Sequence, residues 1–228
     1  MNIALLGNGK TGSRVEYLAK LAGHHVTVFN SKSTPNPKQL NKQDIIISFV
    51  PGNAFLEWMP MLLESGLPVV SGSTGFQWPD GWDVHNKVVQ NKKTIWVHSG
   101  NFSIGCGLIL KLLKELKNQP ESDDFTMKLI ETHHVHKIDA PSGTALLWKN
   151  ALGFEVQIQS VREGEIMGIH ELVLSNDFES ITIRHEVTNR DVFAKGALQT
   201  AEFVHKNNTS IEYGLYDLQQ LMMKYKHL

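Results

Sequence analysis

The sequence contains a single cysteine, Cys106, so it cannot form an internal disulfide, which favours a reducing compartment. No apolar run approaches the roughly 20 residues that a bilayer-spanning helix needs. Neither charge dominates, because 22 basic and 23 acidic side chains leave a formal net charge of -1, which argues against nucleic-acid binding. The first residues lack the basic and apolar regions of a signal peptide. We therefore expect a cytoplasmic protein that binds neither nucleic acid nor membrane.

The chain also has no internal repeat and no low-complexity tract. Its 41% hydrophobic and 20% charged residues are typical of a globular protein rather than a disordered one. A length of 228 residues is sufficient for two modest domains, each with its own core. Cys106 stands between two glycines in an apolar run, so we expect it to be a small core residue and not a nucleophile.

The first half begins with the pattern strand, glycine turn, helix, strand. Residues 2–6 and 26–29 are short apolar runs, and residues 15–22 place apolar side chains at helical spacing. Glycines let the backbone turn tightly and approach a pyrophosphate, which binds at the helix N-terminus. A plain glycine turn in an α/β protein is the alternative. We expect the turn to bind a dinucleotide through Gly7, Asn8, Gly9, Lys10, Thr11 and Gly12.

The residues at the end of the strand predicted at 26–29 indicate whether NAD or NADP is bound. Proteins that prefer NAD carry an acidic residue there, which accepts a hydrogen bond from the ribose 2′-hydroxyl. The stretch 29–32 contains no carboxylate. Asn30 and Ser31 can hydrogen-bond a hydroxyl or a phosphate, and Lys32 can pair with a 2′-phosphate. We expect NADPH, or NADPH and NADH alike, as the cofactor.

Three further apolar runs, at residues 44–50, 67–71 and 94–98, predict parallel strands. Small and polar residues follow the last two runs, at the strand edge where open α/β sheets bind ligands. The cofactor-binding candidates in these two loops are Gly72, Ser73, Thr74, Ser99, Gly100, Asn101 and Phe102.

The pattern changes in the second half, after a helix expected at 105–116 and a polar linker at 118–124. Apolar and polar residues then alternate, which predicts a strand that ends with His133 on the core side and points His134 and His136 to the other face. Further strands are expected at 155–161, 165–174 and 180–187, and helices at 192–205 and 214–223. The whole predicts an α/β protein, with a Rossmann-like parallel-sheet domain followed by an α+β domain built on an open mixed sheet.

The segment 131–144 holds the highest density of ionisable groups, which folding alone does not require. A histidine titrates near neutral pH and can give or take a proton, and Lys137 can donate a proton or pair with a carboxylate. Ser142 is a natural helix N-cap, which leaves the N–H groups of Gly143 and Thr144 to face a carboxylate. These features predict a site that protonates a small anionic substrate beside a nicotinamide.

Zinc binding is the competing interpretation of this segment, because a His-x-His pair on a strand can chelate a metal. The candidate ligands are His134 and His136, with Glu131 and Asp139 nearby and His170 and His185 farther along the chain. No further Cys or His motif supplies a clear third and fourth ligand, so we expect no metal.

Residues 131–145 match the signature Glu-x-His-His-x-x-Lys-x-Asp-Ala-Pro-Ser-Gly-Thr-Ala throughout. The chain thereby resembles the 4-hydroxy-tetrahydrodipicolinate reductase (dihydrodipicolinate reductase) family of lysine and diaminopimelate biosynthesis. Shorter segments that also resemble the family are residues 72–76, 101–105, 162–170 and 193–197. The glycine loop departs from the family's usual Gly-Arg-Met-Gly, since it reads Gly9-Lys10-Thr11-Gly12.

The resemblance implies a role for each matching residue. It makes His133 a proton donor or acceptor and Lys137 the proton-donating lysine. It makes His134 a substrate contact, and Gly143 with Thr144 a backbone cradle for a substrate carboxylate. The implied reaction is the NAD(P)H-dependent reduction of a small cyclic dicarboxylate, 4-hydroxy-tetrahydrodipicolinate or dihydrodipicolinate, to tetrahydrodipicolinate.

The resemblance also implies an organisation. Residues 1–103 would form the dinucleotide-binding domain, 104–190 the substrate-binding and oligomerisation domain, and 191–228 a segment that rejoins the first domain. Hinges near residues 103 and 190 would close the domains over the substrate, and the second domain's sheet would build a homotetramer. Two other functions stay open, namely another two-domain NAD(P)-dependent dehydrogenase and a nucleotide-sensing protein without catalysis.

Overall fold

The computed structural model describes residues 1–119 and 124–225 of the chain. Two compact units make up the protein: unit 1 consists of Met1–Phe102 with Asp191–Leu228, and unit 2 of Ser103–Arg190. Most of the linker predicted at 118–124 lies outside the described residues. No helix in the described part of the chain is long and apolar enough to cross a membrane.

Unit 1 is a parallel sheet with helices. Its elements are β1 (Asn2–Leu6), α1 (Lys10–Leu21), β2 (His25–Phe29), α2 (Pro37–Leu40), β3 (Ile45–Ser48), α3 (Gly52–Ser65), β4 (Val69–Ser71), α4 (Trp82–Asn91), β5 (Ile95–His98), α7 (Asp191–Lys206), β10 (Gly214–Asp217) and α8 (Leu218–Lys224). The strand order is β10-β5-β4-β3-β1-β2, and every pair is parallel. The order reverses between β1 and β3, as in a Rossmann-like fold. The predicted fold class is confirmed for this half.

Both faces of this sheet are covered, which explains why its strands are continuous apolar runs. Ala4 and Leu6 join a buried cluster with α3 and α4. Ile3 and Leu5, which point to the opposite face, are equally buried. The helices α1 and α7 pack on each other, and α7 also contacts β3 and β4.

The prediction of one helix over 214–223 was wrong. Gly214–Asp217 is the edge strand β10, which pairs with β5, and the helix α8 begins only at Leu218. Asp217 caps α8, because its side chain accepts a hydrogen bond from the N–H of Gln219. The loop after β2 also contains the short helix α2, which no apolar periodicity indicated.

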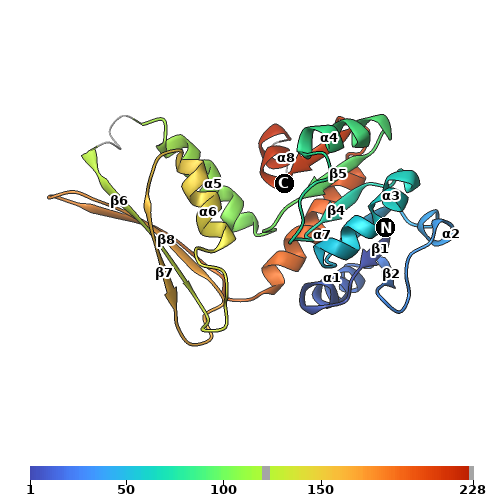
Figure 1. Ribbon diagram of the computed structural model, residues 1–228, viewed down its shortest axis with the longest axis horizontal. Coiled ribbons are helices and arrows are strands. Elements are labelled where there is room, and N and C mark those ends of the chain that lie inside the picture. The colour runs from blue at the N-terminus through green and yellow to red at the C-terminus, as the bar shows by residue number, and fades with distance from the viewer. Residues whose placement is uncertain (120–123, 226–228) are drawn as a thin grey trace. The chain divides into compact units, whose positions relative to one another are not determined.

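Unit 2 is a four-stranded mixed sheet with two helices beside it (Figure 1). Its elements are α5 (Ile104–Leu116), β6 (Thr126–His133), α6 (Gly143–Leu152), β7 (Gln157–Arg162), β8 (Ile169–Ser175) and β9 (Ser180–Glu186). The order is β7-β6-β8-β9, in which β6 and β7 are parallel and the other pairs antiparallel. The predicted mixed sheet is confirmed, although β8 begins at residue 169 and not at 165.

One face of this sheet packs against α5 and α6. Leu129 and Leu172 from the strands join Leu113 and Trp148 from the helices in a buried cluster. Alternation along β6 continues this buried face from Leu129 to Glu131 and then His133. The core-facing side of the strand thus changes from apolar to ionisable within four residues.

Candidate active site

The loops that follow β1, β2, β3 and β4 line one cavity in unit 1. Its volume is about 810 Å³, which is within the range of small-molecule and cofactor sites. The predicted cofactor residues that line it are Gly7, Asn8, Gly9, Lys10, Thr11, Asn30, Ser31, Gly72 and Thr74. The cavity lies at the carboxyl ends of the strands, beside the reversal of strand order, where open α/β sheets bind ligands.

A second, smaller cavity of about 180 Å³ shares Thr11, Phe49, Gly72 and Thr74 with the first. Three of the residues predicted after β5 also line it, namely Ser99, Gly100 and Phe102. Asn101 is not in this lining; its N–H donates to Ser99 Oγ, and the Ser99 hydroxyl donates to the Asn101 carbonyl oxygen. The loop after β4 and the loop after β5, both predicted to bind the cofactor, therefore line two cavities that adjoin each other.

Two other residues predicted to bind the cofactor, Gly12 and Ser73, do not line either cavity but stabilise the loops that do. A Cβ at Gly12 would lie 2.0 Å from the carbonyl oxygen of Gly7, so only glycine lets helix α1 begin this close to β1. Ser73 is buried, and its hydroxyl shares a 2.9 Å hydrogen bond with Ser48. The close backbone packing at Gly12 fits a loop that holds a pyrophosphate.

One wall of the larger cavity was not predicted from the sequence. This wall comes from the loop after β3 and the first turns of α3: Phe49, Val50, Pro51, Asn53, Ala54, Glu57 and Trp58. The available signal was their position, since they lie at or directly after the carboxyl end of the parallel strand predicted at 44–50. Among the described residues that line this cavity, Lys10 carries the only positive charge and Glu57 the only negative charge.

The turn after β2 is built by Asn30. Its Oδ1 accepts hydrogen bonds from the N–H groups of Lys32 and Ser33, at 2.9 and 3.2 Å. This oxygen is therefore engaged by the protein's own backbone. Ser31 lines the cavity, whereas Lys32, the predicted phosphate partner, is not among the lining residues.

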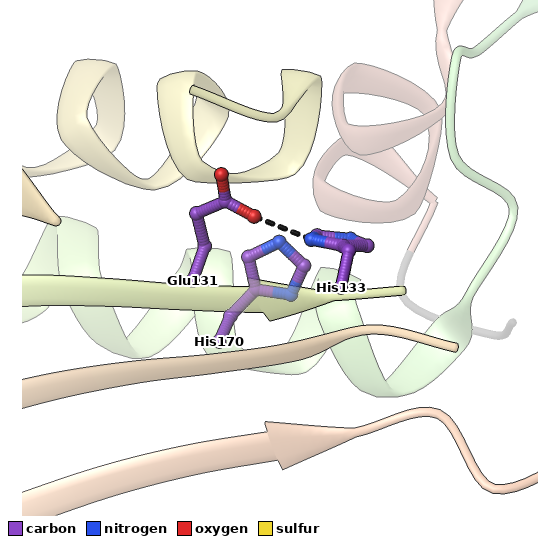
Figure 2. A group of neighbouring side chains, drawn as sticks. All are labelled: Glu131, His133 and His170. Carbon is purple, nitrogen blue, oxygen red and sulfur yellow. Dashed lines mark hydrogen bonds and ion pairs between the residues drawn. The ribbon is translucent and has the colours of Figure 1, made fainter. Parts of the chain in front are cut away.

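In unit 2, Glu131 and His133 of β6 meet His170 of β8 (Figure 2). All three side chains are buried, and the Glu131 carboxylate is fully inaccessible. Glu131 Oε2 is hydrogen-bonded to His133 Nδ1. The rings of His133 and His170 lie edge to face with centroids 5.1 Å apart. His170 Nε2 shares a 2.9 Å hydrogen bond with Ser142 Oγ, which links the cluster to the start of α6.

The charges of this cluster follow from burial and pairing. Burial would raise the pKa of Glu131, but hydrogen bonds from Arg162, Ser160 and His133 lower it below its usual value. The pKa of His133 is lowered, since burial outweighs the opposing effect of Glu131. Burial also lowers the pKa of His170 to about 3. Near neutral pH the cluster therefore holds an ionised Glu131 and two neutral imidazoles.

Lys137 lies in the loop after β6 and is paired with Asp139, at 2.7 and 2.8 Å from its two oxygens. The lysine side chain is 21% exposed and the aspartate 60% exposed. The hydrogen bond from Lys137 lowers the pKa of Asp139. A carboxylate ligand can therefore compete with an exposed partner for this ammonium group.

The helix α6 begins at Gly143, directly after the same loop. Ser142 caps it, because its buried hydroxyl accepts a hydrogen bond from the N–H of Ala145 at 3.2 Å. Gly143 and Thr144 form the first turn, at the positive end of the helix dipole. Such a helix start favours a carboxylate.

The expectation that His134 and His136 point to the outer face of a strand was wrong, because β6 ends at His133 and both residues lie in the turn after it. The His134 N–H donates to the Ile166 carbonyl oxygen at 2.7 Å. The rings of His134 and His136 are 6.3 Å apart. His134 stays close in sequence to the cluster, and its role as a substrate contact stays a prediction.

The potential metal ligands that do gather in the described residues are only partly the predicted ones, because His133 joins Glu131 and His170 in place of His134 and His136. Ligand atoms of Glu131, His133 and His170 all lie within 4.8 Å of one another. Both oxygens of Glu131 already have partners, since Arg162 binds one and His133 the other. An ion would have to displace these hydrogen bonds, so the arrangement favours proton chemistry over metal binding.

A cavity at the carboxyl edge of a parallel sheet, together with a cluster of ionisable side chains in a second unit, fits an oxidoreductase that uses a dinucleotide cofactor. The family model for the C-terminus of dihydrodipicolinate reductase matches residues 105–222, more than half of the chain. The chain therefore belongs to the dihydrodipicolinate reductase family.

Individual relatives agree with this membership, and a solved structure shares the fold. The 4-hydroxy-tetrahydrodipicolinate reductase of Christiangramia forsetii is 29% identical over 92% of this chain and 95% of its own length. That of Thermosipho africanus is 45% identical over 53% of this chain and 55% of its own length. A dipicolinate-bound dihydrodipicolinate reductase from Paenisporosarcina sp. TG-14 has the same fold, with a TM-score of 0.76 and 20% identity over 95% of this chain and 97% of its own.

Proposed function

We propose that this protein reduces 4-hydroxy-tetrahydrodipicolinate to tetrahydrodipicolinate in lysine biosynthesis, with NADPH or NADH as the cofactor. The substrate's 4-hydroxyl group leaves as water, so that the hydride and one proton complete the balance. The observation that carries the proposal is that Glu131, His133 and Lys137 gather beside the start of α6 inside the segment that matches the family. The names of the relatives supply the substrate. The cytoplasmic location stays a prediction from the sequence.

In this proposal unit 1 binds the dinucleotide and unit 2 binds the substrate. The reduced nicotinamide supplies a hydride when bound. The start of α6 at Gly143 and Thr144 holds one substrate carboxylate through its dipole and backbone N–H groups. Lys137 exchanges Asp139 for the substrate and gives it a proton, since an ammonium is the natural acid of this site.

His133 has a different part in the same proton path. Its lowered pKa makes it neutral near pH 7, and its Nδ1–H is held by the ionised Glu131. The Nε2 atom is therefore the one that takes up or passes on a proton. We propose that His133 relays a proton at Nε2 while Lys137 donates the proton that completes the reduction.

Removing either group tests these roles. We expect His133→Gln and Lys137→Ala to lower kcat with 4-hydroxy-tetrahydrodipicolinate by at least ~100-fold, the usual contribution of general acid–base catalysis. The Kd for NADPH, measured by fluorescence, should change little because neither residue lines the cavity of unit 1.

His136→Gln is the matched control, because His136 is exposed in the same loop. Near-full turnover in the His133 or Lys137 variant would refute the assignments. Turnover with keto acids but none with the dicarboxylate would instead favour another dehydrogenase. Cofactor binding without turnover on any substrate would favour a nucleotide sensor.

We propose further that NADPH is preferred and that Lys10 recognises its 2′-phosphate. No carboxylate follows β2 to accept from a ribose hydroxyl, and the Asn30 oxygen is already used by the turn. Lys10 and Ser31 both line the cavity, and Lys10 is its only described cation. A cation there favours the ligand that carries the additional phosphate.

The ratio of kcat/KM for NADPH and NADH tests this preference. We expect Lys10→Gln to lower the ratio by about 10-fold, which corresponds to ~1.4 kcal/mol. Lys32→Gln is the control, because Lys32 is not a lining residue and should leave the ratio unchanged. If Lys10→Gln weakens both cofactors equally, the lysine contacts the pyrophosphate and not the 2′-phosphate.

The family resemblance also leads us to propose a homotetramer built on the sheet of unit 2. One face of that sheet is covered by α5 and α6. The other face carries the partly exposed apolar side chains Ile130, Val161 and Val173, which an assembly can bury. Light scattering after size-exclusion chromatography would show four chains, and a monomer would contradict the proposal.

A further inference from the structure

Glu131 is an unusual residue for its place in the fold. Its side chain has no solvent exposure, and it follows Leu129 on the core-facing side of β6. An apolar residue would fill this position at no electrostatic cost, whereas a buried carboxylate must be fully paired. Both oxygens are paired here: Oε2 with His133 Nδ1, and Oε1 with the Arg162 guanidinium at 2.9 Å.

The ionised state of Glu131 determines the state of His133. An ionised carboxylate only accepts hydrogen bonds, so the Nδ1 atom of His133 must carry the hydrogen. The neutral ring is then unprotonated at Nε2. Gly168 leaves room at this atom, since a Cβ on residue 168 would lie 3.1 Å from His133 Nε2. The pair thus selects one tautomer and one ring orientation.

Arg162 connects this carboxylate to the loop that carries Lys137. Its guanidinium donates to the carbonyl oxygen of Lys137 at 3.2 Å and to that of Asp139 at 2.6 Å. These two carbonyls flank Ile138, whose side chain is 97% exposed and provides no apolar anchor for the loop. The planar guanidinium holds its N–H donors several ångströms apart in a fixed plane, so it reaches these three acceptors at once. A lysine ammonium, whose three donors leave a single atom, does not reproduce this arrangement.

We propose that Glu131 and Arg162 form a positioning pair, in which Glu131 fixes the tautomer of His133 and Arg162 fixes both Glu131 and the Lys137 loop. This inference rests on the proposed function for the roles of His133 and Lys137. The charged and titratable groups that face His133 are Glu131 from β6, His170 from β8, Arg162 from β7, and Lys137 and Asp139 from the loop.

Glu131→Gln tests the first half of the pair. An amide has one oxygen, so either His133 or Arg162 must then face an NH₂ group. We expect kcat to fall about 10- to 100-fold, the usual effect of losing such a supporting partner, with the cofactor Kd unchanged. The limb of the pH–rate profile that reports His133 should move to lower pH, because the carboxylate no longer favours the imidazolium.

Arg162→Lys tests the second half at a side chain that is 20% exposed and tolerates substitution more readily. We expect a higher substrate KM together with a lower kcat, because both the carboxylate and the loop lose their common partner. Glu155→Gln is the control for both variants, since it removes an exposed ion pair with Lys149 in the same unit. It should leave kcat, KM and the pH profile unchanged.

The tautomer of His133 is a readout that needs no turnover. In ¹⁵N-labelled protein, the His133 shifts should show a hydrogen on Nδ1, and in Glu131→Gln a mixture of both tautomers. An unchanged tautomer and an unchanged pH profile in Glu131→Gln would overturn the proposal, even if His133→Gln abolishes turnover. Absence of dicarboxylate reduction in the unmodified protein would instead refute the proposed function, while the tautomer measurement would still test the pair.

Discussion

The first loop of unit 1 has no room for a side chain at residue 12. The Cβ of an alanine there would lie 2.0 Å from the Gly7 carbonyl oxygen, a distance at which the backbone must move. We expect Gly12→Ala to lower the free energy of unfolding by ~1–3 kcal/mol, the usual cost of overpacking. It should also raise the cofactor Kd, because the displaced loop lines the cavity. Urea denaturation and fluorescence titration measure the two effects.

Gly9→Ala provides the comparison within the same loop. A Cβ at residue 9 meets nothing within 4 Å in the protein, and the backbone there has an ordinary φ of -68°. The free energy of unfolding should therefore stay within about 0.5 kcal/mol of the original value. Equal destabilisation by both substitutions would contradict the close packing inferred at Gly12.

The helices α5 and α6 of unit 2 begin in the same way. Ser103 caps α5 and Ser142 caps α6, and each hydroxyl is also bonded to a histidine, His185 or His170 respectively. We expect Ser103→Ala and Ser142→Ala each to cost about 1 kcal/mol of stability, as the loss of an N-cap does. Only Ser142→Ala should raise the substrate KM, because α6 alone is proposed to hold the carboxylate.

Thermal unfolding and steady-state kinetics on the two serine variants separate these effects. A similar rise in substrate KM for both would show that general loss of stability, and not the start of α6, weakens substrate binding. An unchanged KM in Ser142→Ala would count against the proposed carboxylate cradle.

Local sequence patterns predicted most elements, because apolar side chains recur every three to four residues in a helix and every two residues in a half-buried strand. Alternation along β6 placed His133 on the buried face correctly. The strand β10 was missed because Leu215 continues the apolar spacing of α8, and only pairing with β5 makes it a strand. The role of Arg162 was missed for a related reason. It reaches Glu131 through the parallel register of β6 and β7, which no local pattern encodes.

At the scale of the whole molecule, one buried histidine (His170) and one half-buried histidine (His98) make stability depend on pH. Burial lowers the pKa of His98 in unit 1 to about 4 and that of His170 in unit 2 to about 3. An unfolded histidine titrates near 6.5, so below that pH the unfolded chain binds protons that the folded protein does not. Stability is therefore complete above about pH 6.5 and decreases as the pH falls toward the folded values.

The interval from pH 7 to pH 5 isolates this effect, because the carboxylates with lowered pKa, such as Glu131 and Asp139, stay ionised there. We expect the unfolding free energy to fall by more than ~1 kcal/mol over the interval, at up to about 1.4 kcal/mol per pH unit for each of these two histidines. His98→Phe keeps the ring among Phe76 and Trp78 and should reduce the slope, whereas exposed His136→Gln should not. Denaturation curves at the two pH values measure the slope. Equal slopes in all three proteins would mean that His98 takes up protons alike in the folded and unfolded states, which would contradict its lowered pKa.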